Sequence, residues 1–433
     1  MSHYDAKSGA VTDVPAKMAK CWCGRGRRMA LLSLVGLWGS LGLWQGAVSA
    51  LPIDYFALGD SVASGHGLAD DGTACRQSML AYPWLLYARL QESFVVNQFD
   101  VLACSGTTTG SLGRQISEVL SRLSAYPTLV TLTVGVNDFG WSDVFTFAQN
   151  LCIPDDDVFH SRLEGIAQTV EDNLVGQLVR LVAYPQVEII LTDYYNPTNT
   201  SGAFWHRLHP RCLFVDVYDR SQDVVRALNT AITQAQQRLG SPSFVQVATV
   251  HDAFHGHEAP RWWCGTAPPD IDETWIQYPT DPDSNSIPAG GDCFHPNRAG
   301  AAEFAEAVTR LVPPDLGLPL RLVVNDSSFV PGDTLTMTMT ITPESIPMVV
   351  DLYVAIQLPD QSLWFLHGDG SFTSEAQPYL SQWPVAPFRA ELLRYTFTGA
   401  EPSGNYLWLT AFIEPGTGTI VGSMAQAPFT FNP

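Results

Sequence analysis

The sequence contains no lysine after Lys20, although the chain has 433 residues. The formal net charge is −20, and residues 1–50 hold six basic residues against two aspartates, so the remainder has a formal charge of about −24. A surface as acidic as this repels the phosphate backbone of nucleic acids. We therefore expect no nucleic-acid partner.

The sequence also lacks the CxxC and HExxH spacings that are typical of zinc sites. We therefore expect no metal and no other cofactor. Two of the eight cysteines lie within residues 1–50, which have the pattern of a cleaved export signal. Six cysteines therefore remain in the expected mature chain. An even number of cysteines in an exported chain indicates disulfides, here three, made by Cys75, Cys104, Cys152, Cys212, Cys264 and Cys293.

The N-terminal residues 1–50 have the pattern of an export signal. A cluster of arginines precedes the uncharged run "MALLSLVGLWGSLGLWQGAVSA", which ends with Val48 and Ala50 at the positions that a signal peptidase reads. The alternative is an uncleaved anchor helix, since 22 such residues can span a bilayer. Glycine, serine and glutamine near the end of the run favour cleavage. We expect a secreted or periplasmic protein.

Residues 51–312 alternate between apolar runs and amphipathic stretches. This alternation, with continuously apolar strands, predicts an α/β fold whose doubly wound parallel sheet is covered on both faces. Longer insertions interrupt it at 140–160, 196–215 and 255–295. The predicted strands are "PIDYFALG", "FVVNQFDVLAC", "TLVTLTVG", "VEIILTDYY" and "FVQVATVHD", and the predicted helices are "MLAYPWLLYARLQESF", "SLGRQISEVLSRLS", 162–183, 221–239 and one after Asn297.

Residues 321–433 have a different pattern. Short alternating runs such as "DTLTMTMTITP" lie between glycine- and proline-rich turns. This pattern predicts an all-β sandwich. We expect an accessory domain that contacts a cell surface or an insoluble substrate.

Four groups of polar residues lie where the first three strands end and just before the last helix. They are Gly59-Asp60-Ser61, Cys104-Ser105-Gly106-Thr107, Gly135-Val136-Asn137-Asp138 and Asp292-Cys293-Phe294-His295-Pro296. Because ligands bind beyond the carboxyl ends of parallel strands, we expect a hydroxyl, a glycine N–H, a carboxamide and an imidazole to meet at one edge of the sheet.

These groups are what acyl transfer requires. Ser61 becomes a nucleophile when a base takes its proton, and His295 can be that base. Asp292 can orient the histidine by accepting from its other ring nitrogen. The oxyanion needs fixed donors, which the N–H groups of Ser61 and Gly106 and the side-chain amide of Asn137 can supply.

Each group alone has a plainer structural interpretation, and only their order and position favour catalysis. The plainer interpretations are a turn at 59–61, a turn glycine at Gly106, a turn or cap at Asn137–Asp138, a cap at His295 before a helix starting at Pro296, and a loop acid at Asp292.

The series "GDSVASGHG", "CSGTTTG", "GVNDFG" and "DCFHPNRAG" resembles the SGNH, or GDSL-type, hydrolases, with all four blocks in the family order. The resemblance covers residues 51–312 and implies a five-stranded, flavodoxin-like sheet. It implies that Ser61 is the nucleophile, that Gly106 and Asn137 complete the oxyanion hole, and that His295 is the base. In some relatives a backbone carbonyl orients the histidine, so the role of Asp292 stays open.

The placing of the cysteines is most similar to that of secreted bacterial lipases and esterases with three bridges. The resemblance implies the pairs Cys75–Cys104, Cys152–Cys212 and Cys264–Cys293.

The leading hypothesis is a secreted serine ester hydrolase that acts on a lipid or another small carboxylic ester. One alternative is a metal-dependent phosphoesterase, although "GVNDFG" lacks the histidine beside asparagine that such sites use. Another is a non-catalytic surface-binding protein.

Two further groups have competing interpretations. The three histidines in "HDAFHGHEAPRWW" could form a metal cluster, but a loop lining the cleft is favoured. Trp262, Trp263 and Trp275 could form an acyl or sugar platform or simply pack a loop.

Overall fold

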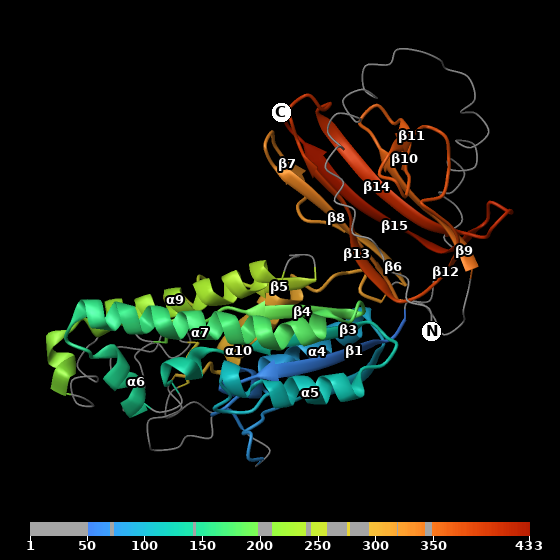
Figure 1. The fold of residues 1–433 in the computed structure, drawn as a ribbon. Helices are drawn as coiled ribbons and strands as arrows, with labels where there is room; N and C mark the ends of the chain where they lie inside the picture. Colours follow the sequence, from blue (N-terminus) through green and yellow to red (C-terminus); the bar gives the residue numbers. More distant parts are fainter. Residues whose placement is uncertain are drawn as a thin grey trace. The chain divides into compact units, whose positions relative to one another are not determined.

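The computed structural model describes residues 51–69, 73–141, 144–197, 210–239, 244–257, 275–277, 294–317, 319–342 and 349–433. The predicted export signal lies outside these residues. Two compact units are present, one at Pro52–Gly317 and one within Leu318–Pro433, and each has its own apolar core (Figure 1). Among the described residues, no helix is long and apolar enough to cross a membrane.

The first unit is built on a five-stranded parallel sheet in the order β2-β1-β3-β4-β5. This is the doubly wound, flavodoxin-like order that the sequence predicts. Helices α5, α7 and α9 cover one face and α4 and α10 the other (Figure 1). The strands are β1 (Ile53–Gly59), β2 (Val96–Val101), β3 (Thr128–Thr133), β4 (Val187–Thr192) and β5 (Val245–Ala248), and the helices are α3 (Ser61–Ser64), α4 (Tyr82–Ser93), α5 (Gly113–Arg122), α6 (Val144–Leu151), α7 (Asp156–Val182), α9 (Val217–Arg238) and α10 (Arg298–Thr309), with 3-10 turns at Thr109–Ser111, Val136–Phe139 and Pro210–Phe214.

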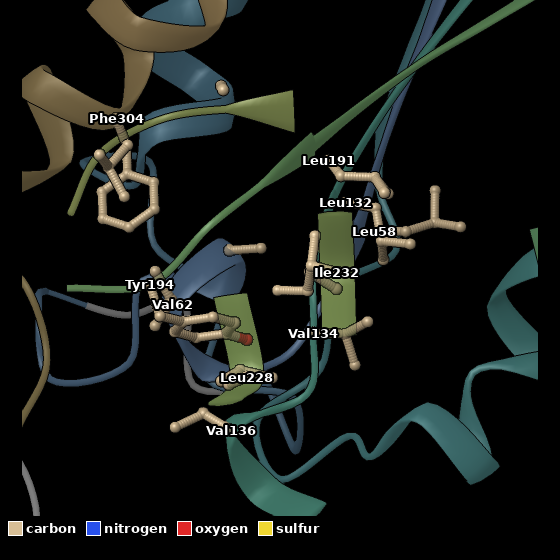
Figure 2. Close-up of a cluster of buried hydrophobic side chains, with 14 of the residues drawn as sticks. Leu58, Val62, Leu132, Val134, Val136, Leu191, Tyr194, Leu228, Ile232 and Phe304 are labelled. Atoms are coloured by element: carbon tan, nitrogen blue, oxygen red, sulfur yellow. The ribbon is translucent and has the colours of Figure 1, made fainter. Parts of the chain in front are cut away.

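The central strands are apolar along their whole length because both of their faces are covered. Every residue of β1, β3 and β4 is buried. Leu58, Leu132 and Leu191 lie in register on these three strands, and Leu228 and Ile232 of α9 pack nearby (Figure 2). All five side chains are at most 1% exposed.

Three helices differ most from the sequence prediction. Helix α9 begins at Val217 and not at residue 221, because Asp216 caps it. Helix α7 begins at Asp156 and not at residue 162, because Asp155 caps it and two acidic residues follow in its first turn, where the helix dipole favours negative charge. Helix α6 lies within the insertion at 140–160, where no helix was predicted. It is short, and Phe147 and Leu151 attach it to the core.

The second unit is all-β, as predicted. A three-stranded sheet in the order β13-β8-β6 and a seven-stranded sheet, with β12 paired to β9, share one apolar core. The alternating run at 334–341 is β8, the central strand of the smaller sheet. The strands are β6 (Leu320–Val324), β7 (Ser328–Phe329), β8 (Thr334–Ile341), β9 (Val349–Gln357), β10 (Leu363–Leu366), β11 (Phe372–Thr373), β12 (Leu380–Pro384), β13 (Phe388–Thr396), β14 (Gly404–Ile413) and β15 (Ile420–Phe431).

Candidate active site

The turn after β1 presents Ser61 at the edge of the sheet. Gly59 has φ +134°, and a Cβ added there would lie 2.1 Å from the carbonyl oxygen of Thr133. Only glycine therefore fits between the ends of β1 and β3. The N–H of Asp60 donates to the same Thr133 oxygen at 2.9 Å. Asp60 caps α3 by accepting from the N–H of Val62 at 2.9 Å, and Ser61 is the first residue of this helix.

Gln115 fixes this turn to the next block, and the sequence analysis did not single it out. Its Oε1 accepts from the N–H of Gly59 at 2.7 Å, and its Nε2 donates to the Gly59 carbonyl at 2.9 Å. The same Nε2 donates to Oγ1 of Thr107 at 3.1 Å, while the N–H of Cys104 donates to the Gly59 carbonyl at 3.0 Å. Gln115 lies on the buried side of α5 with Ile116 and Val119, and a polar residue on that apolar side is the sequence signal that could have identified it. Its side chain is 5% exposed.

The second and third blocks contact each other through Asn137. Its Nδ2 donates to the carbonyl of Thr107 at 2.9 Å, and its side chain is 6% exposed. Gly106 precedes Thr107, has φ +83°, and has no atom within 4 Å of the position of an added Cβ. Asn137 lies within the 3-10 turn Val136–Phe139, so the plainer interpretation as a turn residue is confirmed for its backbone. The interpretation as a cap is wrong, because Gly135 is the N-cap residue of this turn.

His295 lies in a short antiparallel pairing with residues 275–277. The N–H of Gln277 donates to the carbonyl of His295 at 2.9 Å, and the N–H of Asn297 donates to the carbonyl of Trp275 at 2.8 Å. Asn297, and not His295, caps α10, because its side chain accepts from the N–H of Gly300 at 3.0 Å. The interpretation of His295 as a cap is therefore wrong. Its side chain is 5% exposed.

His66 contacts both Ser61 and His295. Its backbone N–H donates to the carbonyl of Ser61 at 3.0 Å. Its ring stacks on the ring of His295, with centroids 4.6 Å apart and an interplanar angle of 14°. The predicted nucleophile and the predicted base are thus both in contact with one residue, which the sequence analysis did not select.

Two tyrosines after β4 hold the neighbours of Ser61 and His295. The hydroxyl of Tyr194 donates to Oδ2 of Asp60, and the hydroxyl of Tyr195 donates to the carbonyl of Phe294 at 2.6 Å. Burial raises the pKa of Asp60 to about 7. Sequence reasoning placed both tyrosines in a strand and gave them no role in the site.

Within the residues that the structure describes, two disulfides are present, Cys75–Cys104 and Cys152–Cys212. Both have the predicted partners. The third predicted pair, Cys264–Cys293, lies outside the described residues. Asp292, Trp262 and Trp263 lie outside them as well.

The other conspicuous aromatic groups pack against each other. His257 stacks on Trp275 with centroids 3.9 Å apart, and Trp275 meets Phe254 edge to face at 5.1 Å. Over the part of the chain that the structure describes, no group of three or more His, Cys, Asp or Glu side chains is arranged to hold a metal ion. Packing therefore accounts for Trp275 and His257.

The fold and the strand-end turns define a doubly wound α/β unit with a candidate site at the carboxyl edge of its sheet, and comparison with known proteins gives its family. Residues 57–303 match the GDSL-like Lipase/Acylhydrolase family. The chain belongs to this family and is a carboxylic-ester hydrolase.

Two similar proteins are lipases. Lipase 1 of Streptomyces coelicolor is 25% identical over 272 residues, which is 59% of this chain and 85% of that protein. A lipase of Streptomyces rimosus is 26% identical over 294 residues, which is 64% of this chain and 95% of that protein. The crystal structure of phospholipase A1 from Streptomyces albidoflavus is 23% identical and covers 61% of this chain and 100% of its own, with a TM-score of 0.43.

Proposed function

We propose that this hydrolase is an exported serine esterase or lipase that forms an acyl-enzyme on Ser61, with His295 as the base. One observation carries the proposal: His66 binds the backbone of Ser61 and stacks on the ring of His295. These two contacts support the proposal because they link the segment that carries Ser61 to the ring of His295 through a single residue.

In the proposed reaction Oγ of Ser61 attacks the ester carbonyl carbon, and its proton passes to His295. The bond to the alcohol then breaks, and the alcohol leaves with that proton. A water molecule next gives a proton to His295 and attacks the acyl-serine. The acid departs, and the proton returns to Ser61, so the enzyme is restored.

The oxyanion of both steps is proposed to bind the N–H groups of Ser61 and Gly106 and the amide of Asn137. An amide nitrogen carries two hydrogens, and Nδ2 of Asn137 uses one on the carbonyl of Thr107. The second is available to the substrate. The open space beside Gly106 leaves room for the substrate oxygen.

The orientation of His295 stays a prediction. Asp292 or a backbone carbonyl is proposed to accept from the ring nitrogen that does not face Ser61. Comparison of Asp292→Asn with His295→Ala separates the two. Equal losses of turnover indicate Asp292 alone, and a much smaller loss in Asp292→Asn indicates a carbonyl.

The names of the relatives favour a lipid ester as substrate. A panel of nitrophenyl esters of graded acyl length tests this. Faster turnover of long chains supports a lipase, and a preference for acetyl or butyryl esters indicates an esterase for small substrates.

A covalent serine probe tests the mechanism against the metal-dependent alternative. A fluorophosphonate is expected to inactivate the enzyme with one label, found on the peptide that contains Ser61. Loss of activity with a chelator and no labelling would instead support a phosphoesterase. Absence of any ester turnover would support a non-catalytic binding protein.

Export and domain limits are also proposed. The signal-like run in residues 1–50 and the two disulfides support export to an oxidising compartment. We propose a hydrolase domain over residues 51–312 and an accessory β-sandwich over residues 321–433 that contacts a surface or insoluble substrate. N-terminal sequencing of the exported protein tests the cleavage after Ala50.

A further inference from the structure

The ring of His66 is held between two side chains. Arg76 NH1 lies 2.6 Å from its Nε2, and Oγ of Ser105 lies 2.6 Å from its Nδ1. A guanidinium group only donates, so Nε2 must accept from Arg76. The proton of the neutral ring is therefore on Nδ1, which donates to Ser105. His66 is thereby fixed in one tautomer and one orientation.

Both partners of His66 lie beside one disulfide. Arg76 follows Cys75, Ser105 follows Cys104, and these two cysteines form a bridge. In addition, the N–H of Ser105 donates to the carbonyl of Cys75 at 3.1 Å. The bridge therefore holds Arg76 and Ser105 at a fixed separation, with the ring of His66 between them.

Gln277 joins the backbones on which the two histidines lie. Its Nε2 donates to the carbonyl of His66 at 2.7 Å and to the carbonyl of Pro296 at 3.0 Å. Its own N–H donates to the carbonyl of His295. The Gln277 side chain is 3% exposed, so water competes little for these bonds. The stacking of the two rings thus has support from the backbone on both sides.

We propose that His66 is a positioning residue for His295. Its neutral ring, fixed by Arg76 and Ser105, limits rotation of the His295 imidazole and stabilises the imidazolium that forms when His295 takes a proton. This inference rests on the proposed role of His295 as the base. The face of a neutral aromatic ring attracts a cation, whereas two protonated rings would repel each other. A flat contact also keeps the base aligned with Ser61.

Three substitutions of His66 separate stacking from polar contact. His66→Phe keeps a flat ring and loses both hydrogen bonds, while His66→Gln keeps polar groups and loses the ring. His66→Ala loses both. We expect kcat for a short-chain nitrophenyl ester to fall about tenfold to a hundredfold in His66→Ala and His66→Gln, with KM unchanged, and only a few-fold in His66→Phe. Melting temperatures are measured on each protein first.

A double-mutant cycle tests whether Arg76 acts through His66. Arg76→Ala is expected to lower kcat a few-fold in the wild-type background and not at all in the His66→Ala background. The matched control is Arg89→Ala on α4, which removes an arginine that pairs with Glu306 at 2.6 Å and does not contact His66. This control is expected to keep the wild-type kcat.

Ser61→Ala and His295→Ala, measured in parallel, separate this inference from the proposed function. If both lose turnover while folded His66→Ala and His66→Gln keep the wild-type kcat, the positioning role is overturned and the proposed function stands. If Ser61→Ala stays active, the proposed function itself fails. If His66→Ala does not fold, His66→Phe and the Arg76 variants decide. If folded His66→Phe loses as much kcat as is expected for His66→Ala, the stacking role is overturned.

Discussion

Each unit of the chain buries a carboxylate that accepts from a tyrosine hydroxyl, yet the two carboxylates differ in pKa. Burial raises the pKa of Asp60 in the first unit to about 7. Burial also acts to raise the pKa of Glu401 in the second unit, but hydrogen bonds outweigh it and lower the pKa. The tyrosines are Tyr194 and Tyr395.

Burial, a nearby charge and the number of donors together explain the difference. Asp60 is 0% exposed and the charge of Asp138 also acts to raise its pKa, whereas Glu401 is 6% exposed. Asp60 accepts from the N–H of Val62 and the hydroxyl of Tyr194. Glu401 accepts from the hydroxyl of Tyr395, from the N–H and hydroxyl of Thr398 at 2.8–3.1 Å and from the N–H of Gly399 at 2.8 Å. Donors that favour the charged form reverse the effect of burial.

The comparison separates a group that stabilises a turn from a group beside a reaction site. Glu401 closes the turn after β13, and its donors satisfy both of its oxygens. Asp60 aligns the start of α3 for Ser61 and is satisfied by fewer donors. We therefore expect substitutions at Ser61 and at the residues that position it to change turnover, and substitutions at Glu401 to change only stability.

The largest expected effect is that of Ser61→Ala. Only a hydroxyl is lost, so melting should be unchanged, while loss of a nucleophile lowers turnover on the order of a millionfold. Steady-state hydrolysis of a nitrophenyl ester and thermal unfolding measure the two effects. A variant that retains a tenth of the wild-type rate would show that Ser61 is not the nucleophile.

The two disulfides of the first unit should differ in their effect on turnover. Cys75→Ser with Cys104→Ser releases Arg76 and Ser105 and, in addition, the turn that holds Gly106 two residues after Cys104. The combined loss of kcat should be about a hundredfold, because a misplacement of about 1 Å at a site can cost that much. The matched double change at Cys152 and Cys212 should lower stability by roughly 3–4 kcal/mol but leave kcat within a few-fold. Equal losses of kcat would contradict the role given to the first bridge.

Glu401→Ala should affect only the second unit. It leaves the hydroxyl of Tyr395 and two backbone N–H groups without their acceptor, which should cost about 2–4 kcal/mol of the free energy of unfolding. The fluorescence of Trp408, which is 1% exposed in that unit's core, reports the unfolding. Turnover of a soluble ester should stay at the wild-type level, and a parallel loss of turnover would show that the second unit helps to build the site.

The smallest expected effects are in the pH dependence of stability, and they have opposite signs. The pKa of Asp60 is higher in the folded chain than in the unfolded chain, so its contribution is complete below about pH 4 and is lost as the pH rises to about 7. The pKa of Glu401 is lower when folded, so its contribution is present above about pH 4.5 and is lost as the pH falls.

Melting curves of Asp60→Asn and Glu401→Gln measure these contributions. Relative to wild type, Asp60→Asn should gain a few degrees as the pH rises from about 4 to about 7. Glu401→Gln should instead gain on wild type as the pH falls below about 4.5. A pH-independent difference in both variants would contradict the pKa shifts.

The sequence correctly predicted the strands in which every residue is buried. The apolar runs of β1, β3 and β4 identify strands covered on both faces, because burial of both faces leaves no place for polar residues. Glycine at 59 followed by Ser61 marked the turn. Boundaries were less certain: the start of α7 was placed six residues late, since its acidic first turn is as polar as a loop.

The sequence by itself determined the fold class, the change of pattern between the two units and the strand ends at which the candidate residues lie. The two described disulfide pairs were predicted from the family resemblance and not from the sequence pattern. Only the tertiary structure decided which distant residues meet there. Gln115 and Gln277 bond to backbone groups, and Tyr194 bonds to the carboxylate of Asp60; these partners lie 19 to 211 residues away in the chain. The sequence neighbourhoods of the three residues are ordinary helix, strand and loop. His66 likewise lies in a glycine-rich turn and contacts His295 only in the folded chain. Contacts of this kind depend on strand order and loop closure, which local periodicity does not encode.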